Sequence, residues 1–316
     1  PNVYGFGHTP LYADVIDAFT QFKFRFKKVD FYLSQQFSRS EYQREGLYRN
    51  GIYANNSYGK SKSQVFENYG FKGGVNYRIS GNHILEANGI YQTKAPTLRN
   101  TFANTRLNNN ITPELESETI FGGDASYIIR TPKLKGRLSG FYNRINDATK
   151  LSFYYAESIG SDDAGDTDSF ISEILTGLDR QNMGAELGLE YQVTPTIKAT
   201  AGASYGKYTY ANNARVRYND DATAATGAPS INDLGTAYLK DYKQGGMPQQ
   251  AYSFGLEYRA PQYWWIGANV NYLDDLYIDP SAILRTSNFV TNKSTGVGYE
   301  GMTTEEVRSM LKQEKL

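Results

Sequence analysis

The sequence predicts an all-β fold, a transmembrane antiparallel up-and-down β-barrel, and three observations carry the prediction. Apolar and polar side chains alternate over segments of strand length, and these segments come in pairs joined by short turns. Aromatic residues, 27 Tyr and 16 Phe in 316 residues, gather beside the turns. Alternation with a period of two places successive side chains on opposite faces of a strand. Each strand then has one apolar face for the lipid and one polar face for the lumen, as a bilayer-spanning barrel requires.

The clearest alternation lies between residues 184 and 208. Leu187 and Leu189 share one parity, whereas Glu186 and Glu190 share the other. Five such hairpins predict about ten strands of roughly 8–13 residues, close to the 9–11 that a tilted transmembrane strand needs. The predicted hairpins span residues 19–37, 66–93, 118–147, 184–208 and 251–272.

Aromatic side chains lie within about three residues of the short turns, for example Phe26, Tyr77, Tyr127, Tyr191 and Trp264. Amphipathic rings at one common level are typical of a membrane interface. No apolar run approaches the ~20 residues of a membrane helix, so insertion would require a closed barrel. A large soluble β protein with its rings in a dry core is the alternative.

Charge and residue types exclude several classes of function. The net charge is zero and no basic patch accompanies the aromatics in the sequence, so we expect no nucleic-acid partner. The chain has no cysteine, which excludes disulfides and thiolate metal sites. We expect no enzyme, because an outer-membrane protease or lipase would need a histidine near the long loops. Of the two histidines, His83 adjoins a short turn and only His8 could serve.

Short turns on one rim face long connections on the other, at about residues 38–64, 94–117, 148–180 and 209–250. In bacterial outer-membrane barrels these rims are periplasmic and extracellular, respectively. The long connections are rich in Asn, Asp, Gly, Ser and Tyr, which suits either a recognition surface or flexible solvated loops. The candidate substrate-binding residues are Tyr53, Tyr58, Arg99, Asn104, Arg106 and Tyr210.

One connection packs Asp162, Asp163, Asp166 and Asp168 into seven residues. Carboxylate oxygens at this density can hold a structural Ca²⁺ ion, although the spacing is not that of an EF-hand. A solvated acidic loop is the alternative, and we expect no other cofactor or metal. Near the end of the chain, Thr303 and Glu306 can form a capping box, which predicts a short amphipathic helix within residues 303–316.

Five segments in the correct order resemble TonB-dependent outer-membrane receptors. Residues 111–127 resemble the L-x-P-E-x-x-x-x-x-E-x-G-x-x-Y segment of that family, and residues 138–147 its F-Y-N-R-I-x-D strand. The other three matches are residues 95–98, 184–208 and 247–249, so that the likeness covers about residues 66–275. The loops resemble those of the Bacteroidetes branch of the family.

The resemblance implies a receptor in the bacterial outer membrane that imports a siderophore, cobalamin, glycan or peptide. The lipid bilayer and lipopolysaccharide would surround it, and a TonB-type energy-transducing complex would pull on a plug. A surface lipoprotein is a further possible partner. Passive porin-like diffusion, or a barrel component of an adhesion or secretion assembly, remains an alternative.

Polar side chains on the parity opposite to the oily one would face the lumen and could pack against a plug or line a water-filled pore. They are Lys72, Asn76, Glu86, Asp124, Arg137, Glu186, Glu190, Lys198 and Glu257.

The family closes about 22 strands around an N-terminal plug. Ten strands account for under half of that number. Residues 1–5 lack the basic start and apolar core of a signal peptide. We therefore expect a fragment of a longer receptor, with the plug domain and last strands outside it. A complete ten-stranded barrel is the alternative.

Overall fold

A computed structural model describes residues 9–157, 168–221, 224, 229–291 and 302–316. Ten strands follow one another through a single antiparallel sheet, in the order β1-β2-β4-β5-β6-β7-β8-β9-β12-β13. Their bounds are Leu11–Arg25, Val29–Gly46, Gln64–Arg78, His83–Lys94, Glu118–Arg130, Leu134–Glu157, Asp168–Gln192, Ile197–Tyr210, Gln250–Arg259 and Trp265–Asp274.

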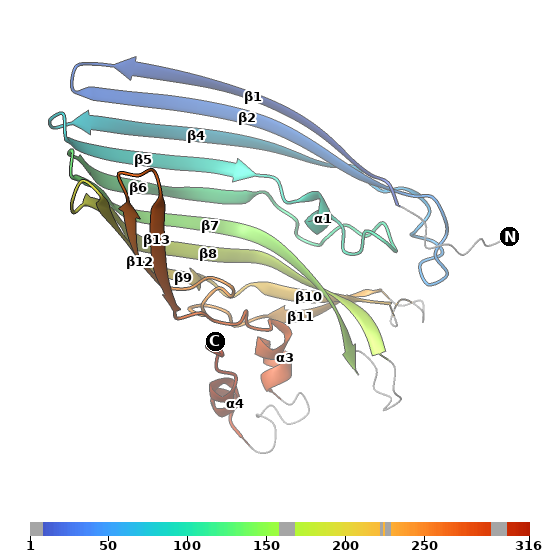
Figure 1. Cartoon of the computed structure of the whole chain (residues 1–316). Helices are drawn as coiled ribbons and strands as arrows, with labels where there is room; N and C mark the ends of the chain where they lie inside the picture. Colours follow the sequence, from blue (N-terminus) through green and yellow to red (C-terminus); the bar gives the residue numbers. More distant parts are fainter. Residues whose placement is uncertain (1–8, 158–167, 222–223, 225–228, 292–301) are drawn as a thin grey trace.

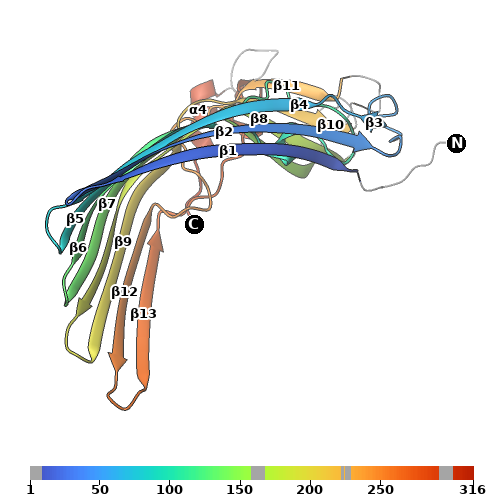
Figure 2. The same cartoon turned by 90° about the horizontal axis from the view of Figure 1, so that it is seen from above.

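The sheet is curved into an open trough (Figures 1 and 2). Strands β1 and β13 lie at its two edges, and no ladder among the described residues joins them. The predicted up-and-down path of about ten antiparallel strands is confirmed. Three strands lie off this path. They are β3 (Gly59–Lys60), which pairs with β2, and β10 (Arg215–Asp220) and β11 (Ile231–Thr236), which form a hairpin beside β8.

The register between neighbouring strands places the apolar side chains in rows on the convex face of the sheet. Residues directly opposite each other in an antiparallel pair point to the same face. Leu138 is 52% exposed and Tyr272 58%, so the row is open to the surroundings of the protein. Following the pairing from β4 to β13, one row reads Tyr77, Leu85, Tyr127, Leu138, Leu187, Ala203, Tyr252 and Tyr272.

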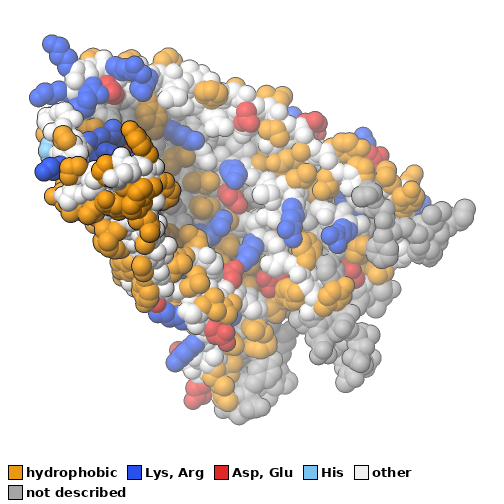
Figure 3. All heavy atoms as spheres, viewed as in Figure 1, with side chains coloured by type: hydrophobic (Ala, Val, Ile, Leu, Met, Phe, Trp, Pro, Cys, Tyr) orange, Lys and Arg blue, Asp and Glu red, His pale blue; other side chains and the backbone are white. Residues whose placement is uncertain are grey.

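The adjacent row belongs to the concave face and is polar from β4 to β9, whereas its continuation on β12 and β13 is apolar, with Ala251 and Leu273. Its members are each one residue along the strand from the apolar row, so the same register fixes both faces. A hollow between the β12–β13 hairpin and the sheet behind it shows charged and polar side chains (Figure 3). From β4 to β9 the row reads Asn76, Glu86, Ser126, Ser139, Glu186 and Ser204.

Strands β7 and β8 run far beyond the predicted hairpin ends. Residues 148–180 were expected to be a long loop, but pairing continues from Ala148–Leu178 to Glu157–Asp168. The expectation was wrong because both faces of this extension are covered, so its sequence no longer alternates. Ile174 and Leu175 are adjacent and both buried.

The apolar core of the molecule lies around this extension and not within the trough. One cluster joins Leu175, Leu178, Val216, Leu239 and Ile283. A second joins Ala103, Leu151 and Ile174 on the other face of the extension. We use the name cap for residues 47–63, 95–117, 209–221, 229–249 and 275–291 with the upper parts of β7 and β8. The described parts of the long connections are therefore packed against one another.

Helices are short and lie outside the sheet. They are α1 (Leu98–Thr101), η1 (Ile283–Arg285), α3 (Ser287–Val290) and α4 (Thr304–Met310). The predicted capping box is confirmed at α4, where the Thr303 amide donates to Glu306 at 2.7 Å and the Glu306 amide to Thr303 Oγ1 at 3.2 Å. The predicted short helix within residues 303–316 is confirmed as α4, and after Met310 the chain continues until Lys315 forms a bridge with Tyr277. Within the described residues, no helix has both the length and the apolar character to cross a membrane.

Candidate functional site

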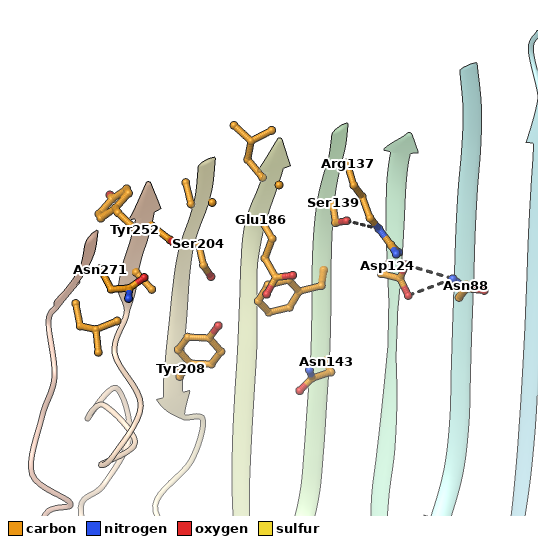
Figure 4. Close-up of a pocket in the computed structure, with 18 residues that line it drawn as sticks. Asn88, Asp124, Arg137, Ser139, Asn143, Glu186, Ser204, Tyr208, Tyr252 and Asn271 are labelled. Atoms are coloured by element: carbon orange, nitrogen blue, oxygen red, sulfur yellow. Dashed lines mark hydrogen bonds between the residues drawn. The ribbon is translucent and has the colours of Figure 1, made fainter. Parts of the chain in front are cut away.

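An open pocket of about 1150 Å³ lies on the concave face and draws its lining from β5 to β13 (Figure 4). Most of the lining follows the parity that points into the trough. On β8, β9 and β12 the lining also includes intervening residues of the apolar row, namely Leu187, Ala203 and Tyr252. The labelled lining residues are Asn88, Asp124, Arg137, Ser139, Asn143, Glu186, Ser204, Tyr208, Tyr252 and Asn271.

Arg137 is the one cation in the pocket lining, and neighbouring strands hold it in place. Its Nε donates to Ser139 Oγ at 3.0 Å and its Nη2 to Ser126 Oγ at 3.0 Å, and Glu86 lies 3.7 Å from Nη2. Asp124 accepts a hydrogen bond from Asn88 Nδ2 at 3.3 Å. In the described part of the chain, the Glu186 carboxylate has neither a hydrogen bond nor an ion pair. The charged groups of the pocket lining are thus two carboxylates and one cation, and side chains such as Phe141 and Leu273 add apolar surface beside them.

Near the short turns, charges of alternating sign cross four strands from β7 to β12. Lys135 lies 2.9 Å from Glu190, and Lys198 lies 3.9 Å from Glu190 and 3.5 Å from Glu257. Arg259 completes the series at 2.6 Å from Glu257. We name this series the charge ladder. Exposed ion pairs each contribute about 0–1 kcal/mol, so its main effect is to balance charge along this part of the rim.

The nine polar residues predicted to face the lumen all lie on the concave face. Seven of them line the pocket, take part in the charge ladder or pair with Arg137, as described above. Lys72 lies opposite Ser34, and Asn76 lies opposite Asp30 on the same face. Their role against a plug or a water column stays a prediction.

Arg44, at the upper end of β2, joins two loops of the cap. It is 2% exposed, and its guanidinium donates to Thr105 O at 2.8 Å, to Ser57 O at 3.1 Å and to Asn109 Oδ1. Burial lowers the pKa of Arg44 to about 10. The loop after β2 and the loop after β5 are therefore fixed to each other through one side chain. No signal in the sequence identified this residue, because its partners lie up to 65 positions away.

Three of the six candidate substrate-binding residues are buried inside the cap. Tyr53 donates to Asp221 Oδ1 at 2.6 Å, and Tyr210 donates to Asp279 Oδ1 at 2.6 Å. Burial, followed by these hydrogen bonds, raises the pKa of both phenols. Asn104 is also buried. In this structure the three side chains hold cap segments together.

The other three candidates are exposed. Tyr58 is exposed at the surface of the loop after β2, and Arg106 on the loop after β5. The Arg99 guanidinium lies over the Phe153 ring, 5.3 Å from its centroid. These three side chains remain free to meet a ligand, and their role in substrate binding stays a prediction.

A buried acid in the cap was missed at the level of the sequence. Glu173 is 6% exposed and accepts a hydrogen bond from Tyr154 Oη at 3.1 Å. Burial raises the pKa of Glu173, and the hydrogen bond from Tyr154 opposes that shift. Close by, Lys150 pairs with Asp279, which ties the segment after β13 to the β7–β8 extension. One carboxyl in a strand of apolar residues gave the only hint of this cluster.

The proposed Ca²⁺ ligands cannot be placed as a group. Asp162, Asp163 and Asp166 lie outside the described residues, and Asp168 begins β8. Within the described ranges, no group of three or more His, Cys, Asp or Glu side chains could hold a metal ion. His83 meets Tyr127 Oη at 2.5 Å beside a short turn, and His8 lies outside the described residues.

Comparison with known proteins identifies the architecture. No protein-family model matches the sequence, and no curated protein matches it either. The solved structure of the copper transporter OprC matches with a TM-score of 0.58 and 16% identity, over 84% of this chain and 35% of that one. The chain thus spans about a third of the length of OprC. A ferric enterobactin receptor mutant from Pseudomonas aeruginosa matches at 11% identity over 100% of this chain and 54% of that one, but its TM-score of 0.30 is too low to support an argument.

The likeness to OprC concerns the fold. It confirms the predicted β-barrel type of architecture, because the chain shares the fold of that transporter over 84% of its length. OprC is a transporter.

Proposed function

We propose that this chain forms part of the barrel wall of an outer-membrane receptor that takes up a scarce nutrient by TonB-energised transport. The observation that carries the proposal is the two-faced register, in which an apolar row and a polar row cross the sheet side by side. A continuous exposed apolar face is unfavourable in water, and acyl chains would cover it. The five family-like segments, in their correct order, support the energised class of barrel.

The bilayer would contact the convex rows, and lipopolysaccharide would surround the wall on the cap side. The energy-transducing complex would act through a plug on the concave face, where the polar row and the pocket provide hydrogen-bonding groups. The nutrient would be a siderophore, cobalamin, a glycan or a peptide, reaching the cap first. Tyr58, Arg99 and Arg106 are the exposed candidates for that contact, and a surface lipoprotein would be a further partner on this side.

The packed cap supports gated uptake over free diffusion. Loops after β2 and β5 are fixed by Arg44, and the β10–β11 hairpin is joined to them through the hydrogen bond of Asn219 Nδ2 to Tyr53 Oη at 3.1 Å. A passive porin-like channel is the second candidate, because the pocket is open, has polar and charged side chains in its lining and would also hold water.

Uptake by cells that carry the full-length protein tests the proposal. Labelled candidate nutrients are supplied with and without a protonophore, and in cells with and without the energy-transducing complex. Energised import predicts saturable uptake that both treatments abolish. Uptake that rises linearly with concentration and survives both treatments would establish the passive channel. Absence of uptake together with a stable copurifying protein would indicate an adhesion or secretion assembly.

A further inference from the structure

Four exposed cations lie at the turn between β1 and β2, where Figure 3 shows Lys and Arg side chains, and two more lie at the turn between β6 and β7 on the same rim. We name this group the basic sector. Among the described residues, none of the six makes an ion pair. The members are Lys23, Arg25, Lys27, Lys28, Arg130 and Lys133.

The basic sector lacks the balancing carboxylates that the charge ladder has. Asp30 is the carboxylate beside it, and Arg78 already holds both of its oxygens, at 2.6 Å from Nη1 to Oδ2 and 3.1 Å from Nη2 to Oδ1. Because Arg78 neutralises Asp30, the six cations of the sector stay in excess. Along the same rim, the charge ladder contains three cations and two carboxylates, so its net charge is only +1. One part of the rim is thus strongly positive and the other nearly neutral.

Register places the strand members of the basic sector on the concave face. Lys23 lies opposite Tyr32, and the pairing continues through Gly74 and Asn88 to Asp124 in the pocket lining. Arg25 and Arg130 lie opposite Asp30 and Lys135, which also belong to the concave face. Lipid headgroups would meet the convex face, so these side chains point away from them.

The turn that carries Lys27 and Lys28 is braced. Arg78 Nη2 donates to Phe26 O at 2.6 Å, and the Arg78 amide donates to Lys28 O at 2.7 Å. Because the turn is already fixed in the free protein, less conformational entropy is lost when a ligand binds to it. A small groove of about 220 Å³ lies further along the concave face and is lined by Gln21, Gln36 and Lys72 among others.

We propose that the basic sector docks an acidic polypeptide segment that enters the concave face from the short-turn end. Charge complementarity identifies the occupant, since concentrated cations attract carboxylates and reject basic chains. The amide groups of the groove would accept and donate hydrogen bonds to the backbone of the same segment. The inference rests on the proposed function, in which a polypeptide meets the concave face, and it specifies the charge of that polypeptide and where it makes contact.

Binding of a fluorescein-labelled ten-residue glutamate peptide to the full chain in neutral detergent tests the proposal by anisotropy. Two double variants are compared, Lys23→Gln with Arg25→Gln and Lys27→Gln with Lys28→Gln. Each removes two charges and should weaken binding about tenfold, at roughly threefold for each exposed charge. Lys135→Gln with Arg259→Gln is the matched control, because it also removes two charges from the same rim but within the ladder, and it should change binding less than about twofold.

Equal weakening by the control would show diffuse attraction of a polyanion and overturn the proposal. Loss of peptide binding in nanodiscs containing phosphatidylglycerol, but not in phosphatidylcholine ones, would assign the sector to lipid headgroups instead. Carbodiimide cross-linking of the full-length protein in outer membranes covers the case of a segment already bound. The cross-linker should join Lys23, Lys27 or Lys28 to an Asp or Glu side chain of a polypeptide. If neither cross-links nor peptide binding are found, the inference is overturned.

Discussion

Replacing Arg44 with methionine should release the cap loops while leaving the wall intact. Methionine keeps most of the side-chain volume and removes the guanidinium that donates to Thr105 O, Ser57 O and Asn109 Oδ1. The buried carbonyl of Ser57, the half-buried carbonyl of Thr105 and the half-buried amide oxygen of Asn109 then lose their donor. Each unsatisfied buried group costs about 1–3 kcal/mol, and removing a desolvated cation returns part of that sum. The net loss in loop stability is about 3 kcal/mol.

Hydrogen exchange measured by mass spectrometry reports this loss directly. A change of about 3 kcal/mol corresponds to roughly 150-fold faster exchange, since 1.4 kcal/mol is tenfold. The acceleration should be confined to residues 47–61 and 97–114. Arg39→Met is the matched control, because Arg39 lies on the same strand and makes an exposed pair with Glu41 at 2.9 Å. Exchange within threefold of wild type at Arg44→Met, or equal acceleration by both variants, would refute the reasoning.

Three further outcomes are expected. Leu138→Arg places a charge on the lipid face and should lower the free energy of unfolding in bilayers by about 2–4 kcal/mol. Ser139→Arg, on the concave face, should lower it far less. Equal effects of the two variants in urea-unfolding titrations would contradict the assignment of faces. Glu173→Gln should stabilise the cap at neutral pH, because burial raises the pKa of this carboxyl in the fold and makes its charged form unfavourable there. The advantage should vanish as pH falls through the raised pKa to below the ordinary value of 4.5, and a pH-independent difference in exchange would argue against it. Gly122→Ala should lower the midpoint of thermal unfolding, because a Cβ atom there would lie 2.5 Å from Tyr142 O. Gly89→Ala is its control and should be tolerated, because the nearest atom to a Cβ there would lie 3.9 Å away.

The wall of the protein could be predicted from the sequence because its two faces differ. At Tyr77 and Asn76, as along the whole pair of rows, neighbouring residues meet opposite surroundings, and a period of two follows. Where both faces are covered, at Ile174 and Leu175, that signal is lost, and the strand extension was taken for a loop.

The cap and its contacts could not be predicted for a different reason. Tyr53 and its acceptor Asp221 are 168 residues apart, and the pairing depends on how three loops fold over the ends of the strands. Composition identified these loops as polar and rich in Tyr and Asn. It could not distinguish a buried tyrosine such as Tyr210 from an exposed one such as Tyr58.

The irregular pairing of β7 with β8 has a mechanical consequence. Nine ladders join the ten strands, and eight of them run without a register shift. Both shifts of the ninth fall between Ile145 and Lys150, beside left-handed backbone at Asp147 (φ 59°) and Gly177 (φ 63°). A bend at this level would allow the β7–β8 extension to move relative to the regularly paired strands below it. A force applied at the short-turn end and a force applied at the cap would then act on different hydrogen bonds.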